Sequence, residues 1–278
     1  MSIEEIIREA IKEDIGNGDH SSLLSVPDTA YGKAELRIKE DGIIAGVEIA
    51  LQVFKQIDKS LKTVIFIEDG TAVKVNDIVF EITGKVRSIL MSERLMLNIL
   101  QRMSGIATKT RYFCELIKGT NACLLDTRKT TPNIRILEKM AVRIGGGYNH
   151  RMGLYDMIML KDNHIDYAGG IENAIKKAND YVKKNNIDIK IEIETRSLLE
   201  VEKALSLGGF HRIMFDNFTV DNVRKGVEMV GNSYETEASG NINEHSIRKY
   251  AETGVNFISV GALTHSVKGL DMSLKAIK

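Results

Sequence analysis

The stretch IKIEIETRSLLEVEKALSLGGFHRIMFDN, residues 189–217, decides the fold class. It contains two apolar runs, IKIEIE and RIMFD, separated by a segment with the apolar spacing of a helix. The same order of a short apolar run followed by a helical segment recurs beyond residue 120, with the runs ACLLD, MIML, TEAS and NFISVG. Repeated strand and helix units predict a parallel sheet flanked by helices.

Every one of these runs ends in polar or small residues, as expected where strand C-termini form an active site. Six runs occur where a regular barrel has eight strands, so we predict an open, incomplete α/β barrel with six or seven strands. A doubly wound open sheet is the alternative. The residues at the strand ends are Asp126 to Lys129, Lys161 to His164, Glu194 and Thr195, Asp216 and Asn217, Ser239 to Asn241, and Gly261.

The N-terminal part follows another pattern. Ser2 and Glu5 form a capping box ahead of an amphipathic helix, and residues 33–89 hold β-branched runs separated by Asp-Gly turns. These runs predict a small antiparallel sheet, which a helix over about residues 46–57 would cover on one face. A long helix from Ser92 is predicted to join this α+β part to the second domain.

Composition excludes several classes of protein. Of the 278 residues 43% are apolar, which is enough for a substantial core, and Lys plus Arg equals Asp plus Glu at 38 each. No overall charge therefore favours nucleic acid or an anionic membrane, and no stretch approaches the ~20 apolar residues of a membrane span. Cys114 and Cys123 lack metal-ligand spacing and suit reduced thiols, so a cytoplasmic protein is expected.

Cations gather between residues 102 and 161 although the chain is neutral, which suits binding of a small polyanion. The alternative is a set of solvated helix charges. We favour that alternative for Arg135 and Arg143, because Glu138 is a helix-spaced partner for Arg135. The full set is Arg102, Arg128, Lys129, Arg135, Arg143, Arg151 and Lys161.

Carboxylates and glycine turns complete the predicted strand-end site. Glu194 and Asp216 end consecutive strands and would stabilise positive charge there. The turns at Ser239–Asn241 and Gly261–Ala262, each expected just before a helix, would present backbone N–H groups to a phosphate. The run from Gly145 to Gly147 is more typical of an ordinary loop, and no histidine pair has zinc-ligand spacing, so no protein-bound metal is predicted.

The segments NILQRMSGIAT, LLDTRKTTPNIRILEKMAV, GGGYNHRMGLYDMIMLKDNHI, EASGNI and YAETGVNFISVGALTHS closely resemble the quinolinate phosphoribosyltransferase family, also called nicotinate-nucleotide pyrophosphorylase (carboxylating). The resemblance implies an N-terminal α/β sandwich over residues 1–104, a barrel over 105–264, and a segment 265–278 that packs back on the sandwich. It also implies the activity: phosphoribosyl transfer from phosphoribosyl pyrophosphate to quinolinate with decarboxylation, in NAD biosynthesis.

The resemblance also implies roles for single residues. Quinolinate would be bound by Arg128, His150, Arg151 and Lys161, with Arg102 from the neighbouring subunit of a homodimer that can assemble further into a hexamer. Catalytic roles would fall to Lys129, Lys161, Glu194 and Asp216, near the ribose and a Mg²⁺ ion bound with phosphoribosyl pyrophosphate. The remaining substrate-binding positions are Thr127, Ser239, Gly240, Asn241, Val260, Gly261 and Ala262.

Three positions depart from the family pattern, and two rival functions stay open. Asn241 stands where glycine is common, Arg196 follows Glu194-Thr195 where an apolar residue is common, and Ser21 replaces a threonine. Asn241 would have to adopt a dihedral that asparagine tolerates better than most residues. The rivals are a Schiff-base aldolase or decarboxylase using Lys129 or Lys161, and a non-catalytic sensor or molybdenum-transport-associated paralogue.

Overall fold

The computed structural model describes residues 1–277, which form two compact units. The first unit comprises Met1–Arg111, Thr130–Gly146 and the residues from Leu263 onward. The second comprises Tyr112–Lys129 and Gly147–Ala262. Residues 130–146 thus belong with the N-terminal part, although in sequence they lie between the first two strands of the predicted barrel.

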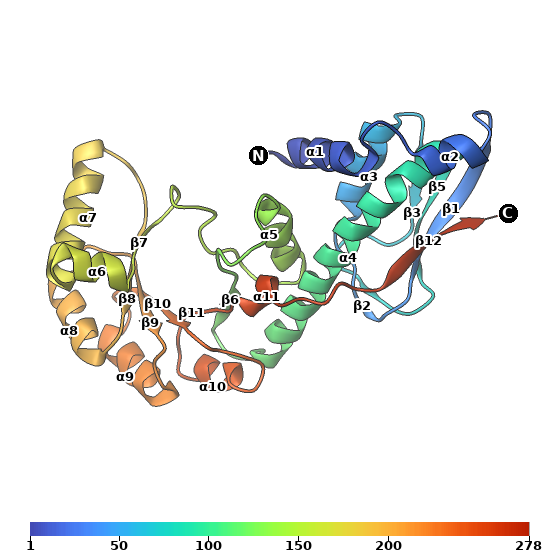
Figure 1. Ribbon diagram of the computed structural model, residues 1–278. Helices are drawn as coiled ribbons and strands as arrows, with labels where there is room; N and C mark the ends of the chain where they lie inside the picture. The colour runs from blue at the N-terminus through green and yellow to red at the C-terminus, as the bar shows by residue number, and fades with distance from the viewer. Residues whose placement is uncertain (278) are drawn as a thin grey trace. The chain divides into compact units, whose positions relative to one another are not determined.

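The first unit is built on a four-stranded antiparallel sheet in the order β12-β1-β5-β3. The C-terminal strand pairs with β1, so that Leu36 stands between Phe80 and Leu274, and all three side chains are buried. Figure 1 shows this red strand running beside blue β1. The strands are β1 Tyr31–Ile38, β3 Lys62–Ile65, β5 Ile78–Lys85 and β12 Met272–Ile277, with β2 Gly42–Ile43 and β4 Ala72–Val73 forming a separate pair.

Helices cover this sheet as their apolar spacing predicts. Helix α1 (Ile3–Ile15) has the predicted capping box between Ser2 and Glu5. Helix α3 (Val47–Ile57) buries Val53 and Phe54, and the Phe54 ring meets Phe80 edge-on with centroids 5.7 Å apart. The antiparallel sheet and its covering helix are therefore confirmed. A further short helix, α2 (His20–Ser25), lies between α1 and β1 in the chain.

The long helix begins earlier than predicted. Helix α4 spans Val86–Leu116 and follows β5 without an intervening loop. Ser92, taken as its start, is buried inside it and donates its hydroxyl to the Ile89 carbonyl at 2.7 Å. A serine can satisfy its hydroxyl within a helix in this way as well as at an N-cap, which is why the boundary prediction was wrong. Helix α5 (Arg135–Ile144) also belongs to this unit.

Gly105 allows the C-terminal segment to cross α4 closely. A Cβ at Gly105 would lie 2.2 Å from the Lys268 carbonyl oxygen and 3.0 Å from Val267 Cγ1. Gly105→Ala is therefore expected to lower the free energy of unfolding by about 1–3 kcal/mol, although alanine is the better helix former. Urea denaturation would measure this loss of stability. Asn98→Ala, on the exposed side of α4, is the control. Equal stability of the two variants would contradict a steric clash at residue 105.

The second unit contains the parallel sheet that the repeated runs predict. Its order is β6-β11-β10-β9-β8-β7, and every pair is parallel. Strands that are consecutive from β7 to β11 are neighbours, and β6 closes onto β11 rather than onto β7. A doubly wound sheet would reverse its order near the middle, so an incomplete barrel open between β6 and β7 is confirmed. The strands are β6 Cys123–Leu125, β7 Ile158–Leu160, β8 Ile191–Thr195, β9 Arg212–Asp216, β10 Glu235–Ser239 and β11 Phe257–Ser259.

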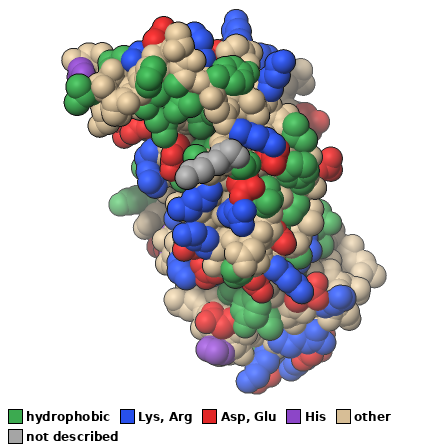
Figure 2. Space-filling model, turned by 90° about the vertical axis from the view of Figure 1, so that its right-hand side faces the viewer, with side chains coloured by type: hydrophobic (Ala, Val, Ile, Leu, Met, Phe, Trp, Pro, Cys, Tyr) green, Lys and Arg blue, Asp and Glu red, His purple; other side chains and the backbone are tan. Residues whose placement is uncertain are grey.

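Helices flank the outside of this sheet, as Figure 1 shows for the yellow and orange segments. They are α6 Asp162–Ala168, α7 Ile171–Asn185, α8 Leu198–Leu207, α9 Val220–Val230 and α10 Ile247–Ala251, and the four-residue α11, Ala262–His265, follows β11. No helix in the described residues is long and apolar enough to cross a membrane. Figure 2 shows positive and negative side chains interspersed on the face it presents, in keeping with the equal charge counts.

Candidate active site

The C-terminal ends of the six parallel strands lie along one edge of the second unit. The strand register places Leu160 beside Ile193, Thr195 beside Phe215, and Asp216 beside Ser239. Residues that end these strands or follow them are thereby gathered at one rim, as the pattern of polar strand ends predicts. The rim carries Thr127, Arg128, Lys129, Lys161, Glu194, Asp216, Ser239, Gly240, Asn241, Val260, Gly261 and Ala262.

Asp126 brings His150 and Arg151 to this rim. It is fully buried at the end of β6, and its carboxylate accepts hydrogen bonds from the His150 backbone N–H at 2.8 Å and from Asn149 Nδ2 at 2.6 Å. Tyr148 bridges to Leu125 in the same segment. The loop before β7 therefore takes the place beside β6 that a further barrel strand would occupy. Asp126 was predicted as a strand-end residue, and its role in positioning this loop was not predicted.

Arg128 and Arg151 are close enough for their charges to interact. Burial, and next the neighbouring Arg128 guanidinium, lower the pKa of Arg151. Arg151 is 8% exposed and donates from Nη1 to the Met157 carbonyl at 3.2 Å. Two guanidinium groups that repel each other in a partly buried place gain most when an anion with more than one negative group binds between them.

Lys161, Glu194 and Asp216 form the mixed-charge part of the rim. Lys161 Nζ lies 3.4 Å from Glu194 Oε2, an ion pair in which the lysine is about half exposed and the glutamate is buried. Burial raises the pKa of Glu194, Lys161 opposes this shift, and the nearby Asp216 adds to it. The lysine ammonium is thus held by a carboxylate, which favours its use as a cation over its use as a Schiff-base nucleophile.

The turn after β10 differs from the predicted helix N-terminus. Gly240 and Asn241 both have positive φ, 94° and 53°, so Asn241 does adopt the dihedral that its replacement of glycine demanded. The next helix, α10, begins only at Ile247, and α11 after Gly261 has only four residues. The expected helix therefore does not directly follow the turn at residues 239–241, whereas a short helix does begin at Ala262. Backbone N–H groups of the turns are the groups that could face a phosphate there.

A buried charged cluster lies inside the barrel, one layer below the rim. Glu192 and Glu237 stand two residues before the rim residues Glu194 and Ser239, and Arg212 stands four residues before Asp216. Side chains two or four residues apart on a strand share a face. Arg212 Nη1 lies 3.0 Å from Glu237 Oε2, and His150 Nε2 lies 2.9 Å from Glu192 and 3.5 Å from Glu237.

His150 is thereby turned toward protein groups on both sides of its ring. Its Nδ1 accepts from the Arg151 backbone N–H at 2.7 Å, while Nε2 faces the two buried glutamates. In this arrangement His150 supports Arg151 and the loop, rather than presenting a ring nitrogen to the rim. Sequence reasoning missed the cluster, although charged residues alternating along strands of a barrel interior are the signal that indicates it.

The cluster has the spacing of a metal site but the charge balance of an ion network. Ligand atoms of His150, Glu192 and Glu237 lie within 4.8 Å of one another. Burial raises the pKa of Glu192 and of Glu237 to about 7, while Arg212 lowers both. The Arg212 side chain, 10% exposed, also stacks on Phe257 at 4.0 Å and binds Glu235 at 3.0 Å. A cation is already in place among these carboxylates, so no metal ion is needed there.

Arg102 belongs to the first unit and is held there by its own chain. Its Nε and Nη2 donate to Glu138 at 3.0 and 2.8 Å, and Nη2 donates to the Thr264 carbonyl at 2.6 Å. Glu138 is 1% exposed. The predicted pairing of Glu138 with Arg135 was wrong, because Glu138 turns inward to Arg102, and Arg135 Nε instead donates to Thr130 at 2.8 Å.

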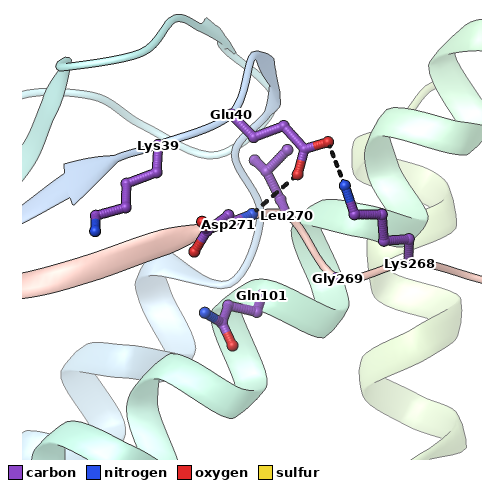
Figure 3. Close-up of a pocket in the computed structure, with 7 residues that line it drawn as sticks. All are labelled: Lys39, Glu40, Gln101, Lys268, Gly269, Leu270 and Asp271. Carbon is purple, nitrogen blue, oxygen red and sulfur yellow. Dashed lines mark hydrogen bonds and ion pairs between the residues drawn. The ribbon is translucent and has the colours of Figure 1, made fainter.

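The glycine run and the surface depression of the first unit have structural explanations. A Cβ at Gly145 would lie 2.6 Å from the Ala107 carbonyl oxygen, so this glycine lets α5 end against α4. Figure 3 shows the depression, where Lys268 and Glu40 pair at 2.8 Å and Leu270 donates its N–H to the Gln101 carbonyl at 3.0 Å. The first contact ties the C-terminal segment to the residues after β1, and the second ties it to α4.

Arg196, the second departure from the family pattern, is exposed and links two helices through ion pairs. It donates to both Asp166 oxygens at 3.0 and 3.1 Å and to Glu200 at 2.8 Å, and these carboxylates raise its pKa. Asp166 is in α6 and Glu200 in α8, and both are satisfied without a ligand.

Arg196→Ala is therefore expected to leave kcat and both KM values within about twofold and to lower stability by about 0.5–1 kcal/mol, the range of surface ion pairs. Steady-state kinetics and thermal melting would test this. Asp166→Ala is the matched control and should give the same small loss of stability; a loss of substrate affinity in Arg196→Ala alone would assign the arginine to the site.

Comparison with known proteins agrees with this geometry. Two family models match, the quinolinate phosphoribosyl transferase N-terminal domain over residues 19–104 and its C-terminal domain over residues 106–275. The chain is 43% identical to the chloroplastic nicotinate-nucleotide pyrophosphorylase [carboxylating] of Arabidopsis thaliana, covering 98% of this chain and 82% of that protein. It is 41% identical to the probable nicotinate-nucleotide pyrophosphorylase [carboxylating] of Bacillus subtilis, covering 99% and 93%.

Solved structures give the same result. The nicotinate-nucleotide pyrophosphorylase from Francisella tularensis superposes with a TM-score of 0.93 at 38% identity, covering 99% of this chain and 96% of that one. The NadC structure from Streptococcus pyogenes gives 0.93 at 37% identity, covering 99% and 97%. The residues that carried the resemblance thus stand in a matching fold, and the chain belongs to the quinolinate phosphoribosyltransferase family.

Proposed function

We propose that this protein transfers the phosphoribosyl group of phosphoribosyl pyrophosphate to quinolinate and decarboxylates the product, which yields nicotinate mononucleotide, carbon dioxide and pyrophosphate for NAD biosynthesis. Family membership supports the reaction class. The observation that carries the assignment to this site is a single rim that holds two neighbouring guanidinium groups, Arg128 and Arg151, and two neighbouring carboxylates, Glu194 and Asp216. The two arginines form the cationic half of the site, which fits a dicarboxylate. Glu194 and Asp216 form its anionic half, which fits a positive charge that develops during the reaction.

Binding of quinolinate relies on the cationic half. Arg128 and Arg151 would pair with its two carboxylates, and Lys161 would provide a third cation from the end of β7. Thr127 and Lys129 follow the same strand as Arg128, and the Thr127 hydroxyl accepts the Lys129 backbone N–H at 3.0 Å. His150 would act behind Arg151, holding its backbone through the ring nitrogen.

Phosphoribosyl transfer relies on the anionic half. The pyridine nitrogen attacks C1 of the ribose, and the bond to pyrophosphate breaks with its electron pair leaving on oxygen. Positive charge develops on the ribose ring, where Glu194 and Asp216 would stabilise it. Lys129 and Lys161 would face the departing pyrophosphate, while Ser239 to Asn241 and Val260 to Ala262 would bind the 5-phosphate through backbone N–H groups.

Decarboxylation then follows from the chemistry of the intermediate. The ribosylated pyridine nitrogen is cationic, so it stabilises the electron pair left on C2 when the 2-carboxylate departs as carbon dioxide. A solvent proton at C2 completes the product. The residues of the chain hold the remaining 3-carboxylate and exclude alternative orientations, and no covalent bond to the protein forms.

A Mg²⁺ ion bound with phosphoribosyl pyrophosphate fits the donor set of the rim. Mg²⁺ prefers oxygen ligands and commonly reaches a protein through substrate phosphates and one or two carboxylates, which Glu194 and Asp216 supply. When bound, it would neutralise the pyrophosphate leaving group. The rim offers no cysteine, and the buried His150 cluster already contains Arg212, so no separate protein-held metal is proposed.

We further propose a cytoplasmic homodimer in which Arg102 serves the site of the neighbouring subunit, with a hexamer as the alternative assembly. The Glu138 carboxylate accepts hydrogen bonds from Arg102 Nε and Nη2. Nη1 is the guanidinium nitrogen that would donate to a substrate in the neighbouring subunit. Sedimentation of the purified protein would give the assembly state. A mixture of Arg102→Ala and Lys161→Ala subunits would regain activity if each supplies what the other lacks.

Turnover of the purified protein tests the function. The assay contains Mg²⁺, phosphoribosyl pyrophosphate and either quinolinate or nicotinate, and follows carbon dioxide and mononucleotide separately. Equal release of both products with quinolinate is the expected result. Activity with nicotinate alone would change the substrate, trapping by borohydride with a carbonyl substrate would favour the Schiff-base enzyme, and binding without turnover would favour the sensor.

A further inference from the structure

Asn241 and Asn217 form a chain of hydrogen bonds that ends on Asp216. Asn241 Nδ2 donates to Asn217 Oδ1 at 3.0 Å, and Asn217 Nδ2 donates to Asp216 Oδ2 at 2.7 Å. The backbone N–H of Asn217 also donates to the Ser239 carbonyl at 2.9 Å, which ties the end of β9 to the end of β10. The two exposed amides therefore join neighbouring strand ends to one carboxylate of the rim.

The backbone fixes both amides in place. Asn217 and Asn241 have φ values of 55° and 53°, in the left-handed region that asparagine tolerates and most residues do not. Gly240 between the two strand ends lies so close that a Cβ there would be 2.3 Å from Asn217 Oδ1 and 2.8 Å from its backbone nitrogen. The Asn217 side chain is thus confined against Gly240, and Asn241 provides the donor that sets which end of the amide faces Asp216.

We propose that Asn241 is a positioning residue for the reaction: through Asn217 it orients the Asp216 carboxylate toward the reacting ribose. This role depends on the proposed function, and it assigns the side chain at 241 a task separate from any phosphate contact of its backbone. The Asp216 carboxylate is half-buried near Glu194, so its orientation decides how closely it faces the positive charge that develops on the ribose.

Glycine at 241 isolates the side chain, because it keeps the positive φ and the backbone N–H. Asn241→Gly is expected to lower kcat about fivefold, the effect of one hydrogen bond between neutral groups, with the KM for quinolinate unchanged. Asn241→Asp keeps the size and tolerates the same φ but cannot donate, so its kcat should fall at least as far. Asn186→Gly, at the left-handed C-cap of α7, is the matched control and should match the wild type.

A double-mutant cycle distinguishes orientation from general stability. If Asn241 acts through Asn217, adding Asn241→Gly to an Asn217→Gly protein, which keeps the positive φ at 217, changes kcat by less than about twofold, since the chain of hydrogen bonds is already broken. Calorimetric titration with phosphoribosyl pyrophosphate and Mg²⁺ gives a readout apart from turnover. Asn241→Gly should bind this ligand about two- to fivefold more weakly, and Asn186→Gly should not.

The outcomes separate this inference from the proposed function. An inactive wild type would remove the proposed function itself. An active wild type with unchanged kcat and ligand affinity in both Asn241→Gly and Asn241→Asp would overturn the positioning role. Equal losses from Asn241→Gly in the wild-type and Asn217→Gly backgrounds would also overturn it, because the effect would then bypass Asn217.

Discussion

Arg212→Ala is expected to be the most destabilising single substitution considered, lowering the free energy of unfolding by about 3–5 kcal/mol, the range for breaking a buried ion pair. Removing the guanidinium leaves the carboxylates of Glu192 and Glu237, both fully buried, without the arginine cation that β9 places among them. It also removes the stacking on Phe257. Chemical denaturation followed by circular dichroism would measure the loss.

The pH dependence of that loss identifies its cause. Burial already raises the pKa of Glu237 to about 7, above its value in an unfolded chain, and loss of Arg212 raises it further. A carboxyl with a raised folded-state pKa contributes stability below its unfolded pKa, and this stability is lost as the pH rises through the folded-state value. The deficit of Arg212→Ala should therefore be larger at pH 8 than at pH 6.

Two comparisons complete this test. Arg224→Ala removes an exposed arginine that pairs with Asp221 at 3.2 Å, and it should cost less than about 1 kcal/mol. Adding Glu237→Gln to Arg212→Ala removes one of the unpaired charges and should recover part of the stability at pH 8. If Arg212→Ala and Arg224→Ala melted alike, the buried cluster would have no role in holding the barrel together.

The features predicted from sequence were those with a local signal. The alternation of apolar runs and helical segments predicts the parallel sheet, because each run can bury itself only between helices. Polar residues at strand ends predict the rim, since parallel strands end at one edge. The incompleteness of the barrel follows from the same pattern, because six runs occur where a regular barrel has eight strands. The place of the opening, between β6 and β7, comes from the structure alone.

The features that were missed depend on contacts between distant residues. Arg212 bonds to Glu237 only because β9 pairs with β10 in a register that sets Arg212 opposite Glu235, two residues before Glu237. Neither Arg212 nor Glu237 belongs to a sequence motif. Glu138 faces Arg102, 36 positions earlier, although Arg135 is the nearer partner along the helix. Ser92 resembles a helix start in sequence, and only the continuous run from β5 into α4 shows that the helix has already begun.

Arg128→Ala is expected to weaken quinolinate binding about a hundredfold or more, as the loss of charge-assisted hydrogen bonds worth about 3 kcal/mol would give. The fold should remain intact, because Arg128 is at the rim and its charge acts against that of Arg151. Calorimetric titration with quinolinate gives the affinity, and thermal melting gives the stability. Unchanged affinity in a folded variant would remove Arg128 from the substrate site.

A comparison of two ligands shows which carboxylate Arg128 binds. Nicotinate keeps only the 3-carboxylate, so a loss confined to quinolinate would place Arg128 on the departing 2-carboxylate, and equal losses would place it on the retained one. Arg143→Ala is the control, since Arg143 is exposed in the last turn of α5 and belongs to the first unit. We expect Arg128→Ala to lower the affinity for quinolinate strongly and the melting temperature little, because Arg128 and Arg151 repel each other when no anion is bound. This combination is typical of a residue that binds substrate.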